Sequence, residues 1–371
     1  MVNEIRASSL HRAMSCVGSL SVKNVLFEEA GQAAKDGTAV GELLSEMIRQ
    51  QTVKPKIGVT ASNGVYLDND MWFYATEFYE TLVDKANGKH NLSTEMRIDW
   101  MTKAGVKIRG QYDVCFIKGT ELHIQDLKYG FGLVEAKENW QLLAYAIGKA
   151  IELFNTAQFI PSKVVLTIHQ PRAFHDEGPT RVWEISYEEL LQYREMIETM
   201  ARRHAEGDRT LTTGKGCKYC PAASSCAALN HAVHSAIDTA LTDWNDSEIS
   251  NEDLPNYLRL LERASEVLEI KKKSMETLTI SRIQNGQPVK GYSYEMTYGN
   301  RAWKSDVTPD SIKVLTGVDV MEQTMMSPNK AEKAGLSKEF TKFFTEKASR
   351  GLKLIKNDLE EEVKQVLPKP Y

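Results

Sequence analysis

Two aspartates and a lysine, Asp113, Asp126 and Lys128, have the side-chain types that hydrolytic sites use. Carboxylate oxygens are the ligands that a hard divalent cation such as Mg²⁺ prefers in proteins. A lysine ammonium beside two carboxylates can orient or deprotonate a water molecule. If the fold brings the three side chains together, they supply the groups for hydrolysis.

The segment around these residues is typical of a β-hairpin. Two alternating apolar runs, Val106–Ile117 and Glu121–Leu127, flank a short break that contains a glycine, as expected for a tight reversal. Asp126 and Lys128 are two residues apart, so they point to the same face of an extended strand. A suitable register would bring Asp113 close to Asp126. Because a lone D-x-K is common on solvated surfaces, its significance depends on the rest of the chain.

Two polar residues on the next predicted helix could join the hairpin. The apolar spacing over Glu138–Phe154 predicts a helix, on which Gln141 and Tyr145 lie one turn apart and share a face. We expect this face to look towards the hairpin. Taken alone, the same pair describes an ordinary polar helix edge.

The surrounding elements predict an α/β fold with a mixed sheet. Residues 4–51 are predicted to be helical, and a helix opening near Asp36 carries Glu42 and Glu46 one turn apart, a spacing most typical of a solvated face. Ser186 and Glu189 form a capping box that opens another helix. Strands are predicted at 94–100, 163–169 and 181–185. Helices that alternate with strands in this way favour an α/β domain.

Three of the five cysteines are closely spaced, at Cys217, Cys220 and Cys226. Thiolates in a C-x2-C-x5-C pattern can wrap one metal ion or cluster. Cys16 is preferred as the fourth ligand over Cys115, which lies in an apolar strand and is more simply a buried thiol. A set of four thiolates suits either an iron–sulfur cluster or Zn²⁺, and an odd cysteine count argues against a disulfide framework.

Composition excludes some classes of protein. No apolar run is long enough to cross a bilayer, and the first residues contain no apolar signal core, so we expect a cytoplasmic protein. A net charge of −4 gives no global argument for nucleic-acid binding, although a local basic groove would suffice for it.

We expect three parts in the chain: a core over 1–235, a long-helix segment over 236–290 and a small accessory domain over 291–371.

The order of these motifs resembles the RecB-type branch of the PD-(D/E)XK nucleases. Gly110-x-x-Asp113, Asp126-x-Lys128 and Gln141-x-x-x-Tyr145 look like the G-x-x-D, (D/E)-x-K and Q-x-x-x-Y motifs of that branch. One early and three late cysteines resemble the iron–sulfur staple of AddB-type exonucleases. The tail, with Asn300–Trp303 and Ser327–Lys333, looks like that of phage and prophage members.

The resemblance implies a restriction-endonuclease-like core and a metal-dependent deoxyribonuclease. By this resemblance Asp113 and Asp126 bind Mg²⁺ or Mn²⁺, Lys128 is the catalytic lysine, and Gln141 and Tyr145 line the DNA-facing side of the site. Cys16, Cys217, Cys220 and Cys226 would hold a [4Fe–4S] cluster, with Zn²⁺ as the alternative.

The family's G-T-x-x-H sequence is incomplete in this chain. Gly41 stands where the family carries a histidine, so Glu42 or Glu46 is the expected substitute carboxylate.

Three functional hypotheses follow. The leading one is a hydrolase that acts as an exonuclease on linear DNA ends in phage recombination or repair, beside a phage single-strand annealing protein in the host cytoplasm. A second is a DNA-binding or interaction protein whose nuclease site has decayed, as the glycine at position 41 would allow. The third is a zinc-stapled structural protein in which D-x-K is incidental.

Overall fold

A six-stranded mixed sheet forms the centre of the protein, seen in a computed structural model that describes residues 4–22, 32–54, 56, 59–241, 250–303, 307, 309–320 and 328–356. The strand order is β1-β3-β4-β5-β6, and β2 pairs with β3. The strands are β1 (Glu4–Arg6), β2 (Ser93–Met101), β3 (Lys107–Lys118), β4 (Glu121–Leu127), β5 (Lys163–His169) and β6 (Thr180–Ser186).

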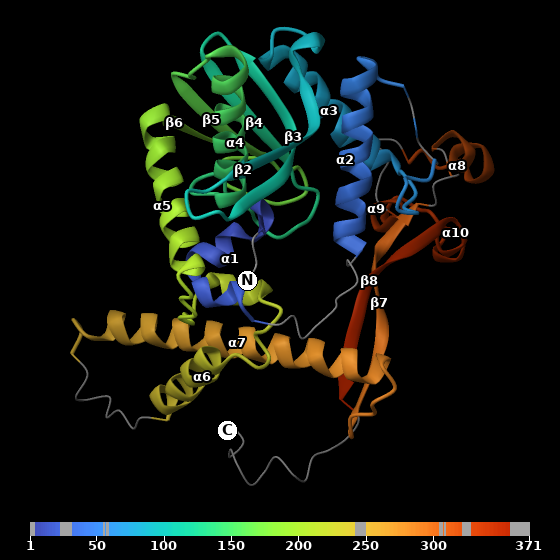
Figure 1. Ribbon diagram of the computed structural model, residues 1–371. Helices are drawn as coiled ribbons and strands as arrows, with labels where there is room; N and C mark the ends of the chain where they lie inside the picture. Colours follow the sequence, from blue (N-terminus) through green and yellow to red (C-terminus); the bar gives the residue numbers. More distant parts are fainter. Residues whose placement is uncertain are drawn as a thin grey trace.

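Helices pack on both faces of this sheet (Figure 1). The helices of this part are α1 (Leu10–Ser15), α2 (Gln32–Gln50), α3 (Asn69–Lys85), α4 (Trp140–Ala157) and α5 (Tyr187–Ala205), with 3-10 turns at Ala7–Ser9, Val17–Leu20, Lys89–Asn91 and Lys215–Tyr219. One apolar core joins the sheet to α1, α4 and α5, and a second joins the opposite face to α2 and α3. The predicted α/β fold with a mixed sheet flanked by helices is confirmed.

The β3–β4 hairpin has the predicted shape. Lys118 pairs with Glu121 across the turn and Val114 pairs with Gln125, while Gly119 has φ +61°, a conformation that glycine adopts at little steric cost. β4 then pairs with β5 in parallel along its whole length. This pairing places the end of β4 in the interior of the sheet.

A gap in the pairing of β3 lies beside the predicted site. β2 occupies one edge of β3 from Lys107 to Cys115. On the other edge β1 pairs with Lys107–Arg109, and β4 pairs only from Val114 onwards. Residues 110–113 are therefore free of strand partners on that edge, where side chains from α4 can approach.

The first strand differs from the helix predicted over residues 4–51. Only Ile5 of the three β1 residues is buried, and β1 pairs with β3 in parallel. Three residues are too few for periodicity to separate strand from helix. The partner that fixes the extended conformation lies a hundred residues away in the chain.

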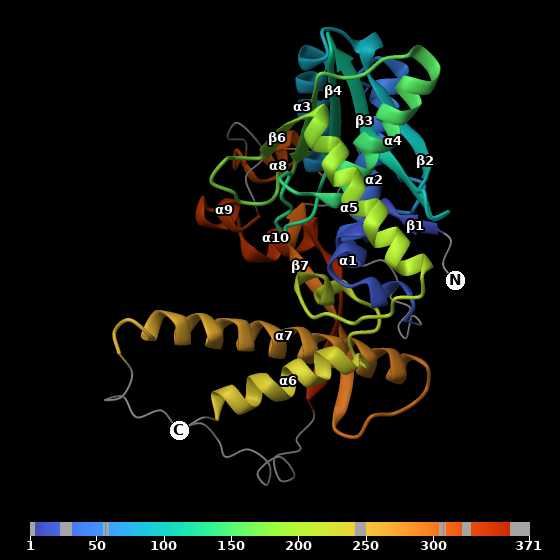
Figure 2. The same cartoon turned by 60° about the vertical axis from the view of Figure 1, so that its left-hand side comes forward.

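The C-terminal part consists of long helices and a two-stranded ribbon. The elements are α6 (Ala227–Ala240), α7 (Leu254–Gln284), β7 (Tyr292–Trp303), α8 (Pro309–Thr316), α9 (Pro328–Lys333), α10 (Lys338–Phe344) and β8 (Thr345–Lys356). α6 packs along α7, and β7 pairs with β8 (Figure 2). The predicted domain boundaries at 235 and 290 stay predictions, and Ser327 of the tail motif lies outside the described residues.

Within the described ranges, no helix combines the length and apolar character needed to cross a bilayer.

A buried histidine at the end of β5 makes stability depend on pH. His169 stacks on Phe78 with ring centroids 4.2 Å apart, and burial, reinforced by Lys85 and Arg181, lowers its pKa to about 4. The unfolded chain then binds the proton more tightly than the fold between about pH 4 and the ordinary histidine value. Because of His169, the free energy of unfolding is highest above about pH 6.5. It decreases by about 3 kcal/mol as pH falls from there towards 4.

We predict that His169→Asn reduces the decrease in the free energy of unfolding at acidic pH. Urea unfolding at pH 7 and at pH 5 measures the loss in each protein. The variant should lose less stability between the two values than the parent, whatever its absolute stability. His90→Asn, at an exposed histidine, is the matched control, and equal slopes for the parent and His169→Asn would contradict the prediction.

Candidate active site

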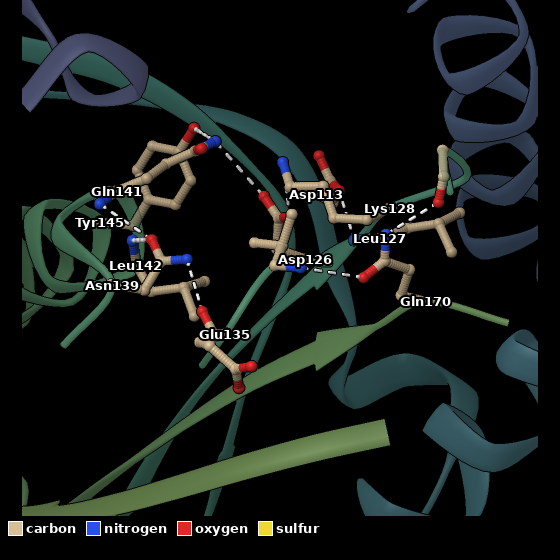
Figure 3. Close-up of polar contacts among 12 residues, drawn as sticks. Asp113, Asp126, Leu127, Lys128, Glu135, Asn139, Gln141, Leu142, Tyr145 and Gln170 are labelled. Atoms are coloured by element: carbon tan, nitrogen blue, oxygen red, sulfur yellow. Dashed lines mark hydrogen bonds and ion pairs between the residues drawn. The ribbon is translucent and has the colours of Figure 1, made fainter. Parts of the chain in front are cut away.

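The hairpin and the end of β4 bring the predicted acidic pair and the lysine together. Extending the β3–β4 register by one step places Asp113 opposite Asp126. Lys128 Nζ lies 2.8 Å from Asp126 Oδ2, and Asp113 Oδ2 accepts a hydrogen bond of 2.7 Å from the backbone N–H of Leu127 (Figure 3). The Lys128 N–H donates to the carbonyl oxygen of His169 at 2.8 Å. The backbone that carries all three side chains is thus held by the sheet.

The two polar residues of α4 face the same cluster. Gln141 Nε2 donates to the Tyr145 hydroxyl at 2.7 Å and lies 3.4 Å from Asp126 Oδ1 (Figure 3). Asn139 caps the helix, because its side chain accepts from the backbone N–H groups of Gln141 and Leu142, a stabilising arrangement for a helix N-terminus. The cap fixes the first turn of α4 and therefore the position of Gln141.

Gly110 lets α4 approach the gap in β3. A methyl group at this position would lie 2.5 Å from Tyr145 Cε1 and 3.0 Å from Ala7 Cβ. Only a residue without a side chain therefore allows the Tyr145 ring to lie against β3. The G-x-x-D spacing has a packing reason as well as a chemical one.

Five of these residues, Asp113, Asp126, Lys128, Gln141 and Tyr145, line one cleft. It has a volume of about 850 Å³ and is bounded by α2 on one side and by the start of α4 on the other. Asp126 is 2% exposed, so the carboxylate lies in the floor of the cleft rather than at its rim. The site is open enough for a polymer segment and enclosed enough to strengthen electrostatic interactions.

Burial and neighbouring charges shift the pKa values of Asp113 and Lys128. Burial, together with the neighbouring Asp126 carboxylate, raises the pKa of Asp113 well above its usual range, because two adjacent carboxylates cannot both ionise cheaply. Burial disfavours the Lys128 ammonium, but Asp126 and Asp113 outweigh this and raise its pKa. At neutral pH Asp113 therefore keeps its proton beside a charged lysine.

Arg49, Glu95 and Gln111 line this cleft and were among the residues that the sequence prediction missed. Glu95 lies on β2 between residues paired with Val114 and Tyr112, so it faces Asp113 across the strands, and Gln111 Nε2 donates to it. Its φ of +53° is uncommon for a residue with a side chain. No pattern in the sequence marks this conformation, since Glu95 occupies an ordinary place in an alternating strand.

The predicted divalent metal site is wrong. In the described part of the chain, no group of three or more His, Cys, Asp or Glu side chains is placed to hold a metal ion. Glu42 accepts hydrogen bonds from the backbone and hydroxyl of Ser62, and Glu46 pairs with Lys56. Neither expected substitute therefore joins Asp113 and Asp126, and Mg²⁺ or Mn²⁺ has no ligand set here.

The predicted iron–sulfur cluster and its Zn²⁺ alternative are wrong for the same reason. Cys16, Cys217, Cys220 and Cys226 line a cavity of only about 20 Å³, room for about one water molecule. Burial raises the pKa of Cys217 and Cys220, which disfavours the thiolate that binds metals. The Cys16 sulfur accepts from the Thr212 N–H at 3.4 Å. All four are free thiols.

A family model described as "Protein of unknown function (DUF2800)" matches residues 4–358. The chain belongs to the DUF2800 family. In this DUF2800 chain the match spans both the sheet that carries the cleft and the C-terminal ribbon. A solved structure titled "Crystal structure of SSO0001" is 14% identical, with 62% of this chain and 88% of that chain covered and a TM-score of 0.28, a likeness too loose to carry an argument.

The raised pKa of Asp113 predicts a stability that falls as pH rises. Above about pH 4 such a carboxyl keeps its proton in the folded protein and loses it in the unfolded chain. The free energy of unfolding therefore decreases as pH rises above about 4. We expect Asp113→Asn to gain at least about 1 kcal/mol over the parent between pH 5 and pH 8. Urea unfolding at both values measures this gain. Asp99→Asn, at an exposed aspartate of β2, should show no such gain. A stability difference between Asp113→Asn and the parent that is the same at pH 5 and pH 8 would contradict the account.

The close approach at Gly110 predicts a packing conflict. Gly110→Ala should destabilise the protein by about 1–3 kcal/mol, because the added methyl displaces the Tyr145 ring. The penalty should shrink in a Tyr145→Ala background, which a double-mutant cycle by urea unfolding measures. Gly37→Ala is the control, since a methyl group there meets nothing within 4 Å. Equal penalties in both backgrounds would show that the ring is not the obstacle.

Proposed function

We propose that this protein is a deoxyribonuclease that hydrolyses phosphodiester bonds in the cleft, with a restriction-endonuclease-like PD-(D/E)XK core. The observation that carries the proposal is the meeting of Asp113, Asp126 and Lys128 on the β3–β4 hairpin, with Gln141 contacting Asp126 from α4. These groups come from three separate sequence motifs in the order typical of RecB-type nucleases. By that resemblance, the substrate is a linear DNA end in phage recombination, and a phage single-strand annealing protein is the proposed partner.

The charges of the cluster suit attack of water on a phosphate. The Lys128 ammonium, 2.8 Å from Asp126, would hold a non-bridging phosphate oxygen and stabilise the charge that develops there. The water oxygen bonds to phosphorus and gives its proton to Asp126. The bond from phosphorus to the leaving oxygen breaks, and this oxygen takes the proton that Asp113 carries. Such acid–base groups contribute about 10²–10⁴-fold each.

Two further residues would orient the reacting groups. Gln141 lies within hydrogen-bond reach of both Asp126 and the Tyr145 hydroxyl, so it fixes the direction of the carboxylate. Burial and the Asp126 charge raise the pKa of Tyr145, which keeps its hydroxyl protonated and able to donate to a phosphate. Gln141 is a positioning group, and both residues enclose the cleft on the α4 side.

A DNA-binding protein without catalysis is the second candidate. The engagement of Glu42 by Ser62 and of Glu46 by Lys56 favours it, because the carboxylate expected from α2 does not reach the cluster. The five motif residues nevertheless lie on one cleft. A cleavage assay separates the two candidates.

We predict that Asp126→Asn and Lys128→Ala each lower the cleavage of end-labelled linear DNA by at least about 100-fold. The asparagine keeps the shape of the aspartate but cannot accept the proton of water. Product length on sequencing gels, compared between linear and covalently closed DNA, shows whether ends are required. Lys163→Ala is the matched control, because Lys163 pairs with Glu121 and Glu184 outside the cleft.

Thermal unfolding confirms that each variant is folded before its activity is compared. A wild-type protein that binds DNA without cutting it would favour the second candidate. Cleavage by Asp126→Asn at the wild-type rate would refute the assignment of the cluster.

A further inference from the structure

The loop from Gly130 to Val134, which follows Lys128, is held by a buried side chain. Gln170, which is 0% exposed, holds this loop, because its Nε2 donates to the carbonyl oxygens of Gly130 and Gly132 at 2.7 and 2.8 Å. Its Oε1 accepts from the Val134 N–H at 3.2 Å. One buried amide side chain thus satisfies three backbone groups of the loop.

A buried arginine completes this support. Arg181 is 1% exposed and donates to Gln170 Oε1 at 2.6 Å and to the Val134 carbonyl oxygen at 2.8 Å. Buried polar networks of this kind fix one conformation strongly, since breaking any member leaves the others unpaired. The loop is therefore held rigidly although it contains two glycines.

The rigid loop holds an aromatic ring out in solvent. Phe131 is 58% exposed, while its neighbour Tyr129 is buried. The Arg172 guanidinium lies 4.2 Å from the Phe131 ring centroid and 4.5 Å from that of Tyr129. Arginine and the two rings form a stack, called here the Tyr129–Arg172–Phe131 stack, whose outer ring is Phe131.

The stack adjoins the cleft. Tyr129 and Gly130 line the cleft together with Lys128, and Phe131 is three residues from Lys128, at most about 11 Å along the chain. The Arg172 charge lowers the pKa of the nearby Asp68. Because its guanidinium makes no hydrogen bond or salt bridge to another described residue, its N–H groups are available to an anion. An exposed aromatic face beside a guanidinium with available N–H groups matches an unpaired nucleotide, which offers a flat base and a phosphate.

We infer that the Tyr129–Arg172–Phe131 stack binds an unpaired nucleobase of the strand whose phosphate lies in the cleft, so that the substrate is single-stranded DNA or the single-stranded overhang of a duplex. The inference rests on the proposed function for the course of the strand. The base stacks on Phe131, and Arg172 contacts the adjacent phosphate. A base inside an intact duplex cannot do this, because its two faces are covered by its neighbours.

Fluorescence of 2-aminopurine, a base whose emission is quenched by stacking, tests this inference. The protein is the full chain with Asp126→Asn, which prevents cutting, and the DNAs are a single strand, a duplex with an overhang and a blunt duplex, each with 2-aminopurine at the end. We expect quenching with the first two DNAs. Phe131→Ala should abolish it and weaken binding of the single strand about tenfold, whereas Phe131→Trp should retain both.

Two further variants complete the design. Arg172→Ala should lower the slope of log affinity against log salt by about one phosphate contact, and Phe154→Ala, which removes an exposed ring of α4 far along the helix, should change neither quenching nor affinity. Because Phe131 and Phe154 are both exposed, their substitutions should leave the melting temperature nearly unchanged.

The outcomes separate this inference from the proposed function. Quenching that survives Phe131→Ala, equal quenching with the blunt duplex, or no binding of any DNA would overturn the inference. If wild-type protein cuts DNA while Phe131→Ala binds like its parent, only the stacking inference fails. If quenching depends on Phe131 but wild-type protein cuts nothing, the stack is supported and the hydrolase is refuted.

Discussion

The pairing of β3 with β4 is the constraint on which the site depends. It places Asp113 opposite Asp126, where burial and the Asp126 charge raise the pKa of Asp113 and the Lys128 ammonium pairs with Asp126. The hairpin turn at Gly119 sets this register. A slip of one residue would turn one carboxylate to the opposite face of the sheet.

The surroundings hold the pair in place. β5 pairs with the whole of β4 and binds the Lys128 backbone through His169, so the lysine emerges from a fixed point. The gap between β1 and β4 along β3 admits the Tyr145 ring over Gly110. The raised pKa of Asp113 marks a cluster that is unfavourable for folding, and apolar cores on both faces of the sheet offset it.

Local sequence patterns predicted most of the helices and strands, but they did not predict contacts between residues far apart in the chain. An apolar, β-branched run located β5 at 163–169, alternation located the hairpin, and the capping box at Ser186 and Glu189 is present. β1 was missed because its partner strand, not its own sequence, makes it extended. The Tyr129–Arg172–Phe131 stack joins residues some forty positions apart in the chain, and no spacing rule reports such a contact.

The cysteines also show that sequence spacing does not report three-dimensional arrangement. Their spacing predicted a metal site, yet spacing does not say whether four sulfurs converge with room for a metal, and here they border a cavity of about 20 Å³. Likewise Glu42 and Glu46 lie on the expected helix, but their partners Ser62 and Lys56 come from a segment with no visible motif.

Hydrolysis in ¹⁸O-labelled water tests the central claim most directly. If Asp113, Asp126 and Lys128 drive attack of water on the phosphate, wild-type protein will release DNA fragments whose new terminal phosphates carry the label. The Asp126→Asn variant will release such fragments at least about 100-fold more slowly. Fragments without label, or labelled fragments in equal yield from the variant, would contradict the account.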